Sequence, residues 1–231
     1  MTPEQQFSPK QERPNINIVK TEEEVSLKIE QYKKLPIIAR AFELLDKLPK
    51  NLIYHDKAHT EDVLHEAILF GVLDGLNEKE LERLAVAASW HDVGFIDRPN
   101  ENEEIAVKHF EESLKDFPLE YREDIKIMIM DTTVHKTDKG LEIIMSNPIS
   151  AYLLDADVSN FGREDFWEKR QQIAEERGVN WEDKTERLAF LQSTLSFIKN
   201  HNWHTEAGKN YRQEQKEKNI IEMEKEIASL N

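Results

Sequence analysis

The chain has 231 residues, with 31 Lys and Arg against 46 Asp and Glu, and its formal net charge at pH 7 is -15. This charge argues against general nucleic-acid binding, because proteins that hold a phosphate backbone do so with a basic surface. The length suits one sizeable core. The absence of cysteine excludes disulfides, thiolate metal sites and cysteine nucleophiles, so any metal must be held by His, Asp and Glu.

Only 7 glycines and 8 prolines interrupt long runs of Glu, Lys, Leu, Ala and Ile, which predicts an all-α fold. Residues 1–20 are polar and contain Pro3, Pro9 and Pro14, so we expect a flexible arm there and a single helical domain over residues 21–231. We find no secretory signal and no run of about eighteen apolar residues. The expectation is a soluble, cytoplasmic protein without a membrane span.

The spacing of apolar residues predicts a first helix after Thr21. Further helices are expected over residues 36–48, 57–75, 77–93, 101–117, 119–135, 147–160, 163–177 and 183–200. Residues 205–230 are predicted to form an amphipathic helix docked on the body. The acidic surface and this long helix are also compatible with a homodimer.

The pair His91-Asp92 continues an inward stripe formed by Leu81, Leu84 and Ala88. The next glycine, Gly94, is interpreted as the signal that ends the helix. A carboxylate in the last turn faces the negative end of the helix dipole, so a buried Asp92 needs a strong positive partner. No Lys or Arg lies between Arg83 and Arg98. A bound cation is therefore a natural partner.

His59 opens another predicted helix, whose inward stripe continues through Val63 and Phe70. His55 precedes it by four residues. A carboxylate is offered by Asp157, which shares a helical face with Leu154 and Phe161, while Asp155 lies on a different face. Periodicity alone leaves the choice between these two aspartates open.

His59, His91, Asp92 and Asp157 would provide two imidazoles and two carboxylates. Such a mixed set suits a divalent ion such as Mn, Fe, Co, Ni, Zn or Mg. A divalent ion lowers the pKa of a coordinated water and polarises a phosphoryl oxygen. Asp92 is also the candidate for orienting that water or accepting its proton.

Other polar residues are candidates for supporting the ligands or binding a substrate. His135, beside Lys136, ends the stripe Ile125, Met128 and Thr132. Glu103 shares a face with Ala106 and Phe110, whereas Glu104 leans to the polar side. Positive charge for a phosphate is available from three residues after Asp157, which a solvated helix face would also explain: Arg163, Lys169 and Arg170. The remaining histidines fit structural roles: His65, His109, His201 and His204.

The segments Tyr54-His55 with His59-Thr60, His91-Asp92-Val93-Gly94 and Asp155-Ala156-Asp157 together resemble the HD superfamily of metal-dependent phosphohydrolases. The resemblance covers roughly residues 50–165 and matches the ligands to His59, His91, Asp92 and Asp157. It implies a helical core around a divalent metal and hydrolysis of a phosphate ester or anhydride in a nucleotide or small phosphorylated metabolite.

The chain departs from this family in two places. The paired His-His motif of members with a second metal is missing, so a dinuclear centre would depend on His135 and a glutamate. Phe95 stands where one branch, which includes cyclic-dinucleotide phosphodiesterases, has a lysine that contacts phosphate. Two other functions remain open: a di-iron oxygenase on the same scaffold, and a ligand-binding or regulatory module without turnover.

Overall fold

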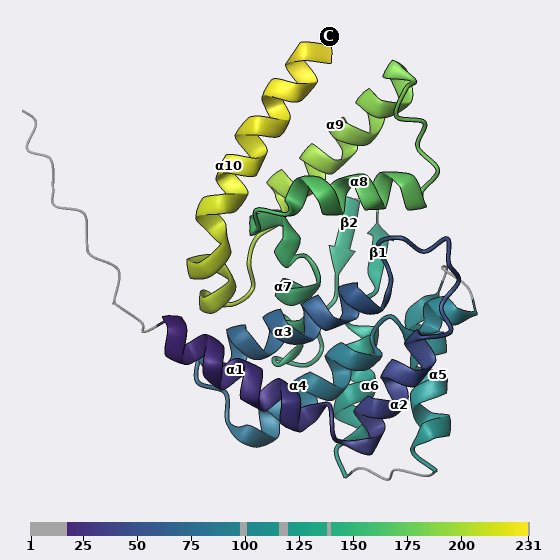
Figure 1. Cartoon of the computed structure of the whole chain (residues 1–231), viewed down its shortest axis with the longest axis vertical. Helices are drawn as coiled ribbons and strands as arrows, with labels where there is room; N and C mark the ends of the chain where they lie inside the picture. Colours follow the sequence, from purple (N-terminus) through teal and green to yellow (C-terminus); the bar gives the residue numbers. More distant parts are fainter. Residues whose placement is uncertain (1–17, 98–100, 116–119, 138–139, 231) are drawn as a thin grey trace, which may run out of the picture.

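The computed structural model describes residues 18–97, 101–115, 120–137 and 140–230, and within them the fold is all-α (Figure 1). Most of the expected N-terminal arm lies outside the described residues. The first helix begins at Ile18, four residues before the start expected after Thr21. No helix in the described ranges has the length and apolar character needed to cross a membrane.

The elements follow one another in this order: α1 (Ile18–Tyr32), α2 (Pro36–Leu45), α3 (Lys57–Leu73), α4 (Glu78–Trp90), the 3-10 helix η1 (Val93–Ile96), α5 (Asn102–Ser113), α6 (Arg122–Met130), β1 (Val134–Thr137), β2 (Gly140–Ile143), α7 (Ser150–Asp157), the 3-10 helix η2 (Ser159–Gly162), α8 (Phe166–Glu176), α9 (Lys184–Asn200) and α10 (Glu206–Leu230).

Helices α3 and α4 lie at the centre of the larger hydrophobic core, which α1, α2, α5, α6 and α7 surround. Their starts are fixed by caps. The Asp56 side chain accepts from the backbone N–H of His59 at 2.8 Å, and Asn77 forms a capping box with Glu80. These caps set which residues of α3 and α4 face inward, and therefore where His59 and His91 point.

A second, smaller core joins α8, α9 and α10, which Figure 1 shows as a layer above the body. Phe166, Leu191 and Ile198 are fully or almost fully buried in it. Helix α10 belongs to both cores, because Ala207 packs in the larger one and Met223 in the smaller one. The two cores therefore share one structural element.

The predicted helix over residues 119–135 is wrong at its C-terminal end. Helix α6 ends at Met130, and β1 pairs with β2 as an antiparallel hairpin in which His135 faces Glu142. The Asp131 carboxylate accepts from the backbone N–H groups of Ser146 and Asn147, both at 3.0 Å, and from the Ser150 hydroxyl. These bonds with the segment after the hairpin favour the chain leaving the helix at Asp131.

The position of Gly94 had suggested that it ends the helix with a left-handed turn, but the structure shows no such turn there. Among the described glycines only Gly75 and Gly178 have a positive φ. Helix α4 ends at Trp90, and Gly94 lies inside η1, where a Cβ atom would come within 1.8 Å of the Asn102 carbonyl oxygen. Glycine is needed here because the backbone of α5 approaches η1 closely.

Candidate metal centre

His59 lies in the first turn of α3, where the Asp56 cap holds the backbone and the side chain points into the protein. The Tyr54 ring covers it, with the two ring centroids 4.6 Å apart. The imidazole is 4% exposed. Its position in the first turn of α3 therefore places Nε2 inside the protein, a short distance from the surface.

His91 caps the C-terminus of α4, and Asp92 follows at the start of η1. Nδ1 of His91 lies 2.8 Å from the carbonyl oxygen of Ala88 and can only donate to it. In the neutral ring the proton is therefore on Nδ1, and Nε2 carries the free lone pair. This bond orients His91 as a metal ligand.

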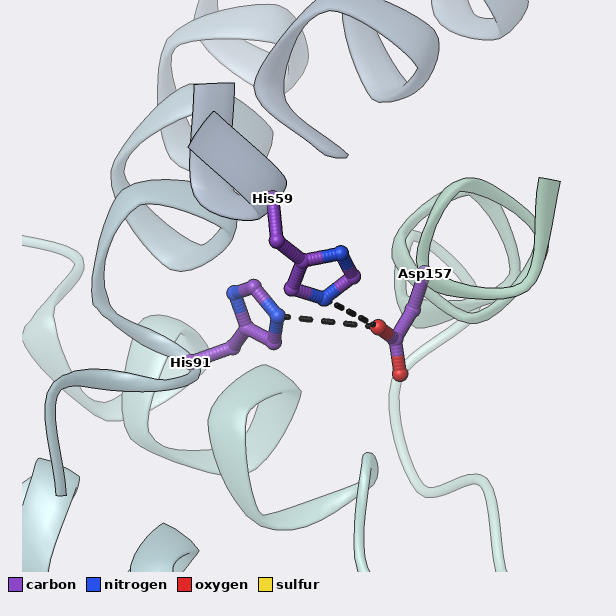
Figure 2. Close-up of side chains that lie close together, drawn as sticks. All are labelled: His59, His91 and Asp157. Atoms are coloured by element: carbon purple, nitrogen blue, oxygen red, sulfur yellow. Dashed lines mark hydrogen bonds and ion pairs between the residues drawn. The ribbon is translucent and has the colours of Figure 1, made fainter. Parts of the chain in front are cut away.

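Asp157 closes α7 and faces both histidines (Figure 2). Its Oδ1 lies 3.1 Å from Nε2 of His59 and 3.7 Å from Nε2 of His91. One ligand atom from each of these three residues falls within 4.8 Å of the others, so the group could hold a metal ion. Asp155, the alternative aspartate, accepts instead from the backbone N–H groups of His204 and Thr205.

Asp92 adds a fourth ligand atom. Its Oδ2 lies 3.3 Å from Nε2 of His59 and 3.2 Å from Nε2 of His91. Within the described part of the chain, Oδ2 of Asp92 and Nε2 of His91 are buried without a hydrogen bond of acceptable geometry. Bonds of about 2.1 Å to one ion would place neighbouring ligand atoms about 3.0 Å apart in an octahedron and about 3.4 Å apart in a tetrahedron. His59, His91 and Asp157 therefore fit a metal ion, since their ligand atoms all lie within 4.8 Å of one another, and Asp92 lies next to the two imidazoles of this group.

The four side chains also perturb each other's ionisation. Burial lowers the pKa of both histidines, but their contacts with Asp157 and Asp92 outweigh it, so the pKa of His59 rises to about 9 and that of His91 also rises. Burial raises the pKa of the two carboxyl groups, but the histidines lower it below its ordinary range. At neutral pH the protonated imidazoles therefore balance the two carboxylates, and a metal ion would have to displace their protons to bind.

An open hollow leads from the surface to this cluster. Asp157, whose side chain is 32% exposed, lies at its inner end, while the other three ligands are at most 8% exposed. The hollow is lined by Tyr54, His59, Asp62, Val63, Ala156, Asp157, Ser159, Asn160, Arg163 and Lys169. A ligand entering it therefore meets Asp157 before the buried ligands.

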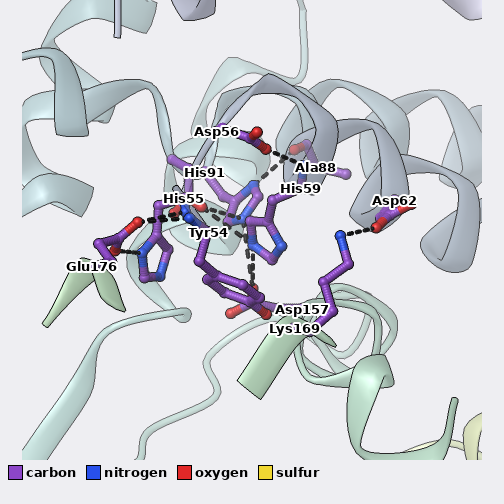
Figure 3. A network of polar contacts seen from close by, with 11 residues as sticks. Tyr54, His55, Asp56, His59, Asp62, Ala88, His91, Asp157, Lys169 and Glu176 are labelled. Carbon is purple, nitrogen blue, oxygen red and sulfur yellow. Dashed lines mark hydrogen bonds and ion pairs between the residues drawn. The ribbon is translucent and has the colours of Figure 1, made fainter. Parts of the chain in front are cut away.

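His55 does not reach the ligand atoms. Its Nδ1 contacts the Glu176 carboxylate, which also accepts from the backbone N–H groups of Tyr54 and His55 at 2.9 and 3.0 Å (Figure 3). Its ring stacks on Phe95, with the centroids 4.5 Å apart. His55 thus ties the segment before α3 to the end of α8, and it supports the centre from outside.

Glu103 lies at the edge of the centre and is half-buried, whereas Glu104 is exposed, as expected. Burial raises the pKa of Glu103, and the charges of Asp92 and Asp157 raise it further. His135 was expected to point inward from a helix, but it is exposed on β1. The position of the Lys136 side chain lies outside the described residues.

The three basic residues that follow Asp157 in the sequence lie in different places in the structure. Arg163 and Lys169 line the hollow, and Lys169 pairs with Asp62 at 2.8 Å (Figure 3). Arg170 instead pairs with Glu226 at 2.6 Å, and its guanidinium lies over the rings of Trp167 and Trp181. Arg170 is thus held by residues of the smaller core and does not belong to the lining of the hollow.

The sequence analysis missed three residues around the site. Asp62 follows His59 by three positions on α3, so helical spacing alone could have indicated it. Tyr54 was noted only as part of a motif. Glu176 is 121 residues away from its partner His55, and no local pattern signals such a contact.

No protein-family model matches the chain, and comparisons with curated proteins and with solved structures also gave no match. The candidate metal centre therefore rests on its own geometry and on the order of its motifs.

Proposed function

We propose that the chain is a metal-dependent phosphohydrolase that cleaves a phosphate ester or anhydride of a nucleotide or small phosphorylated metabolite. The observation that carries this proposal is the convergence of His59, His91, Asp92 and Asp157, together with the unsatisfied buried atoms Nε2 of His91 and Oδ2 of Asp92. The order of these residues resembles the HD superfamily, which supports the same reaction.

The four residues would hold the divalent ion. When bound, the ion supplies a Lewis acid for the phosphoryl oxygen and makes a water more acidic. The carboxylate of Asp92 contacts both imidazoles, and we assign it the further role of accepting a proton from the attacking water. The Nδ1 contact of His91 with Ala88 keeps that imidazole oriented throughout the reaction.

The hollow also bears on the substrate. Its enclosed space, about 10 Å³ on the scale used to compare cavities, has room for about one water molecule. A water molecule fits inside it beside Asp157, and a phosphoryl group would lie at its open mouth with the rest of the substrate outside. The walls that would recognise that remainder carry no motif, so the proposal names a reaction and a substrate class only.

The decisive experiment measures metal content by elemental analysis and activity on a panel of phosphomonoesters and phosphodiesters. Wild type is compared with Asp92→Ala and with His109→Gln, a matched control whose histidine pairs with Asp97 instead. We expect about one bound ion per chain and metal-dependent hydrolysis, both strongly reduced in Asp92→Ala and kept in His109→Gln. Metal content and activity that are intact in Asp92→Ala would show that the site is wrongly assigned.

The same measurements separate the alternatives. Two iron ions per chain with oxygen consumption would identify the oxygenase instead. One tightly bound ion with no turnover across the whole panel would favour a binding or regulatory module. The proposal therefore requires both metal binding and hydrolysis.

A further inference from the structure

We infer that Lys169 and Arg163 form an anion-binding wall in the hollow, and that this wall selects phosphomonoesters over phosphodiesters. The inference rests on the proposed function, because it names the substrate class of the same site. It is carried by side chains that are already placed and held beside Asp157.

Lys169 reaches the hollow from the first turn of α8. Its ammonium lies 2.8 Å from Oδ2 of Asp62, and its side chain is 15% exposed. Among the described residues, Asp62 is the one carboxylate paired with it within 4.0 Å. An ammonium carries three N–H donors, so the pair leaves donors free for an anion. Asp62 thus keeps Lys169 over the hollow without using its full capacity to donate.

Arg163 approaches from the end of η2 and is fixed more rigidly. Its Nε and one terminal nitrogen donate to the two carboxylate oxygens of Asp165 at 2.9 and 2.6 Å. Its backbone oxygen accepts from the buried amide of Asn219 on α10 at 3.0 Å. The same terminal nitrogen lies 3.4 Å from Oδ2 of Asp62, the carboxylate that also pairs with Lys169. A guanidinium has five N–H donors, so these pairs leave part of its planar edge for another acceptor. Arg163 is therefore preorganised beside the hollow.

The charge balance at the centre explains why these cations matter. A divalent ion held by Asp92 and Asp157 has its two charges offset by two carboxylates. A phosphate that enters the hollow then meets the partly exposed Asp157 in a chain whose net charge is -15. Positive charge at the wall is needed to offset this repulsion. Lys169 and Arg163 are the basic residues that line the hollow, and they share one carboxylate of the lining, Asp62.

This balance favours one class of ester. At neutral pH a phosphomonoester is largely a dianion, with pKa about 6 for its second proton, whereas a phosphodiester carries one charge. A phosphomonoester therefore offers an additional negative charge and a third terminal oxygen to the two cationic side chains, and it matches them better than a phosphodiester does. The favoured substrate is therefore a phosphomonoester.

The first test measures binding of inorganic phosphate by calorimetry, in metal-loaded and metal-free protein. Lys169→Met keeps the length of the side chain and removes its charge, Lys169→Arg restores the charge, and Lys199→Met removes an equivalent charge at an exposed pair with Glu224. We expect Lys169→Met to weaken phosphate binding about tenfold or more, with Lys169→Arg recovering most of the affinity and Lys199→Met unchanged. Equal affinity in wild type and Lys169→Met would overturn the inference.

The second test compares hydrolysis of p-nitrophenyl phosphate and bis-p-nitrophenyl phosphate. We expect a higher kcat/KM for the monoester, and a larger rise in KM for the monoester than for the diester in Lys169→Met. Metal-dependent hydrolysis with equal effects on both esters would overturn the inference and leave the proposed function standing. If no hydrolysis occurs, the proposed function fails, and the phosphate titrations still decide whether the wall binds anions.

Discussion

A contact with a nearby backbone carbonyl orients His91 toward carboxylates from other parts of the chain. Its Nδ1 contact with Ala88 directs Nε2 toward Asp92 and Asp157, and that nitrogen has no protein hydrogen bond among the described residues. It lies 3.2 Å from Oδ2 of Asp92 in a poorly aligned contact, which is weaker than a well-formed hydrogen bond, so the metal-free protein carries a local penalty at this point. An ion that occupies the centre removes the penalty, and metal binding should therefore stabilise the fold.

The first prediction concerns this stabilisation. A divalent ion at 100 times its Kd should raise the unfolding free energy of the wild type by about 2.7 kcal/mol, because it binds the folded chain only. His91→Gln should show little or no increase, and a chelator should reverse the effect in the wild type. Urea denaturation with and without the ion measures both quantities. An equal increase in His91→Gln would place the bound ion elsewhere.

His201 provides a second prediction at this scale. Burial lowers its pKa to about 3, and the nearby charges of Lys216 and His204 act in the same direction. The unfolded chain, where the pKa is about 6.5, binds the proton more tightly. His201 therefore leaves stability unchanged above pH 6.5 and reduces it as the pH falls from 6.5 toward 3, by at most about 1.4 kcal/mol per pH unit.

His201→Gln should remove this part of the pH dependence, because glutamine still accepts from Lys216 and does not titrate in this range. The comparison is made by urea denaturation between pH 6.5 and 5, before most carboxyl groups are protonated. Parallel curves for the two proteins would show that His201 is readily protonated in the folded state.

At the scale of elements, η1 and α5 meet at Gly94, beside Asp92. The Cβ of an alanine there would lie 1.8 Å from the Asn102 carbonyl oxygen and 2.9 Å from the Ala106 backbone nitrogen. Both obstacles are backbone atoms, which cannot rotate away. Accommodating the methyl group would require α5 to move as a whole.

Gly94→Ala should therefore destabilise the fold by about 3 kcal/mol or more, the range of severe packing strain. Gly178→Ala is a useful comparison, because a Cβ there meets nothing within 4 Å and only the positive φ of 68° opposes it. Urea denaturation of the two variants measures the difference. A loss in Gly94→Ala no larger than that in Gly178→Ala would contradict the close approach.

The elements that local patterns define were predictable. Helices α3 and α4 have strong caps and regular apolar spacing, so the orientation of His59 and His91 could be read from the sequence. The hairpin could not, because the partners of Asp131 lie 15 to 19 residues further along the chain. For the same reason the exposed position of His135 was missed. The apolar stripe before it is correct, since Ile125 and Met128 are buried.

Side-chain partners across the fold were less predictable than the ligands themselves. The sequence offered Arg163, Lys169 and Arg170 as equivalent sources of positive charge. Only the packing of α8 against α10 separates them, because it directs Arg170 to Glu226 and leaves Lys169 over the hollow. Helical spacing gives the face of a residue, but not which neighbour that face meets.

At the scale of the whole molecule, α10 connects two hydrophobic cores. Arg212 on α10 also pairs with the buried Glu66 of α3. Removing one partner of a buried ion pair leaves an uncompensated charge, so α10 cannot detach from α3 without a large cost. The two cores should therefore lose their structure together.

The last prediction follows from this connection. Calorimetric unfolding should give one transition in which the calorimetric and van't Hoff enthalpies agree. Arg212→Met should lower the midpoint temperature of that transition without splitting it. Two resolved transitions in the wild type would show that the cores unfold independently and that α10 couples them only weakly.

The contact of Asn219 with the backbone of Phe161 and Arg163 has a consequence for synthesis. Translation completes the four ligands once residue 157 has been added, but the amide that anchors the Arg163 loop comes 62 residues later than Asp157. A nascent chain, or one cut before α10, would thus have every metal-binding group but lack the anchor of its anion-binding wall. Because α10 also holds the buried Glu66 of α3 through Arg212, we expect a product truncated in this way to lose the fold that positions the candidate ligands as well.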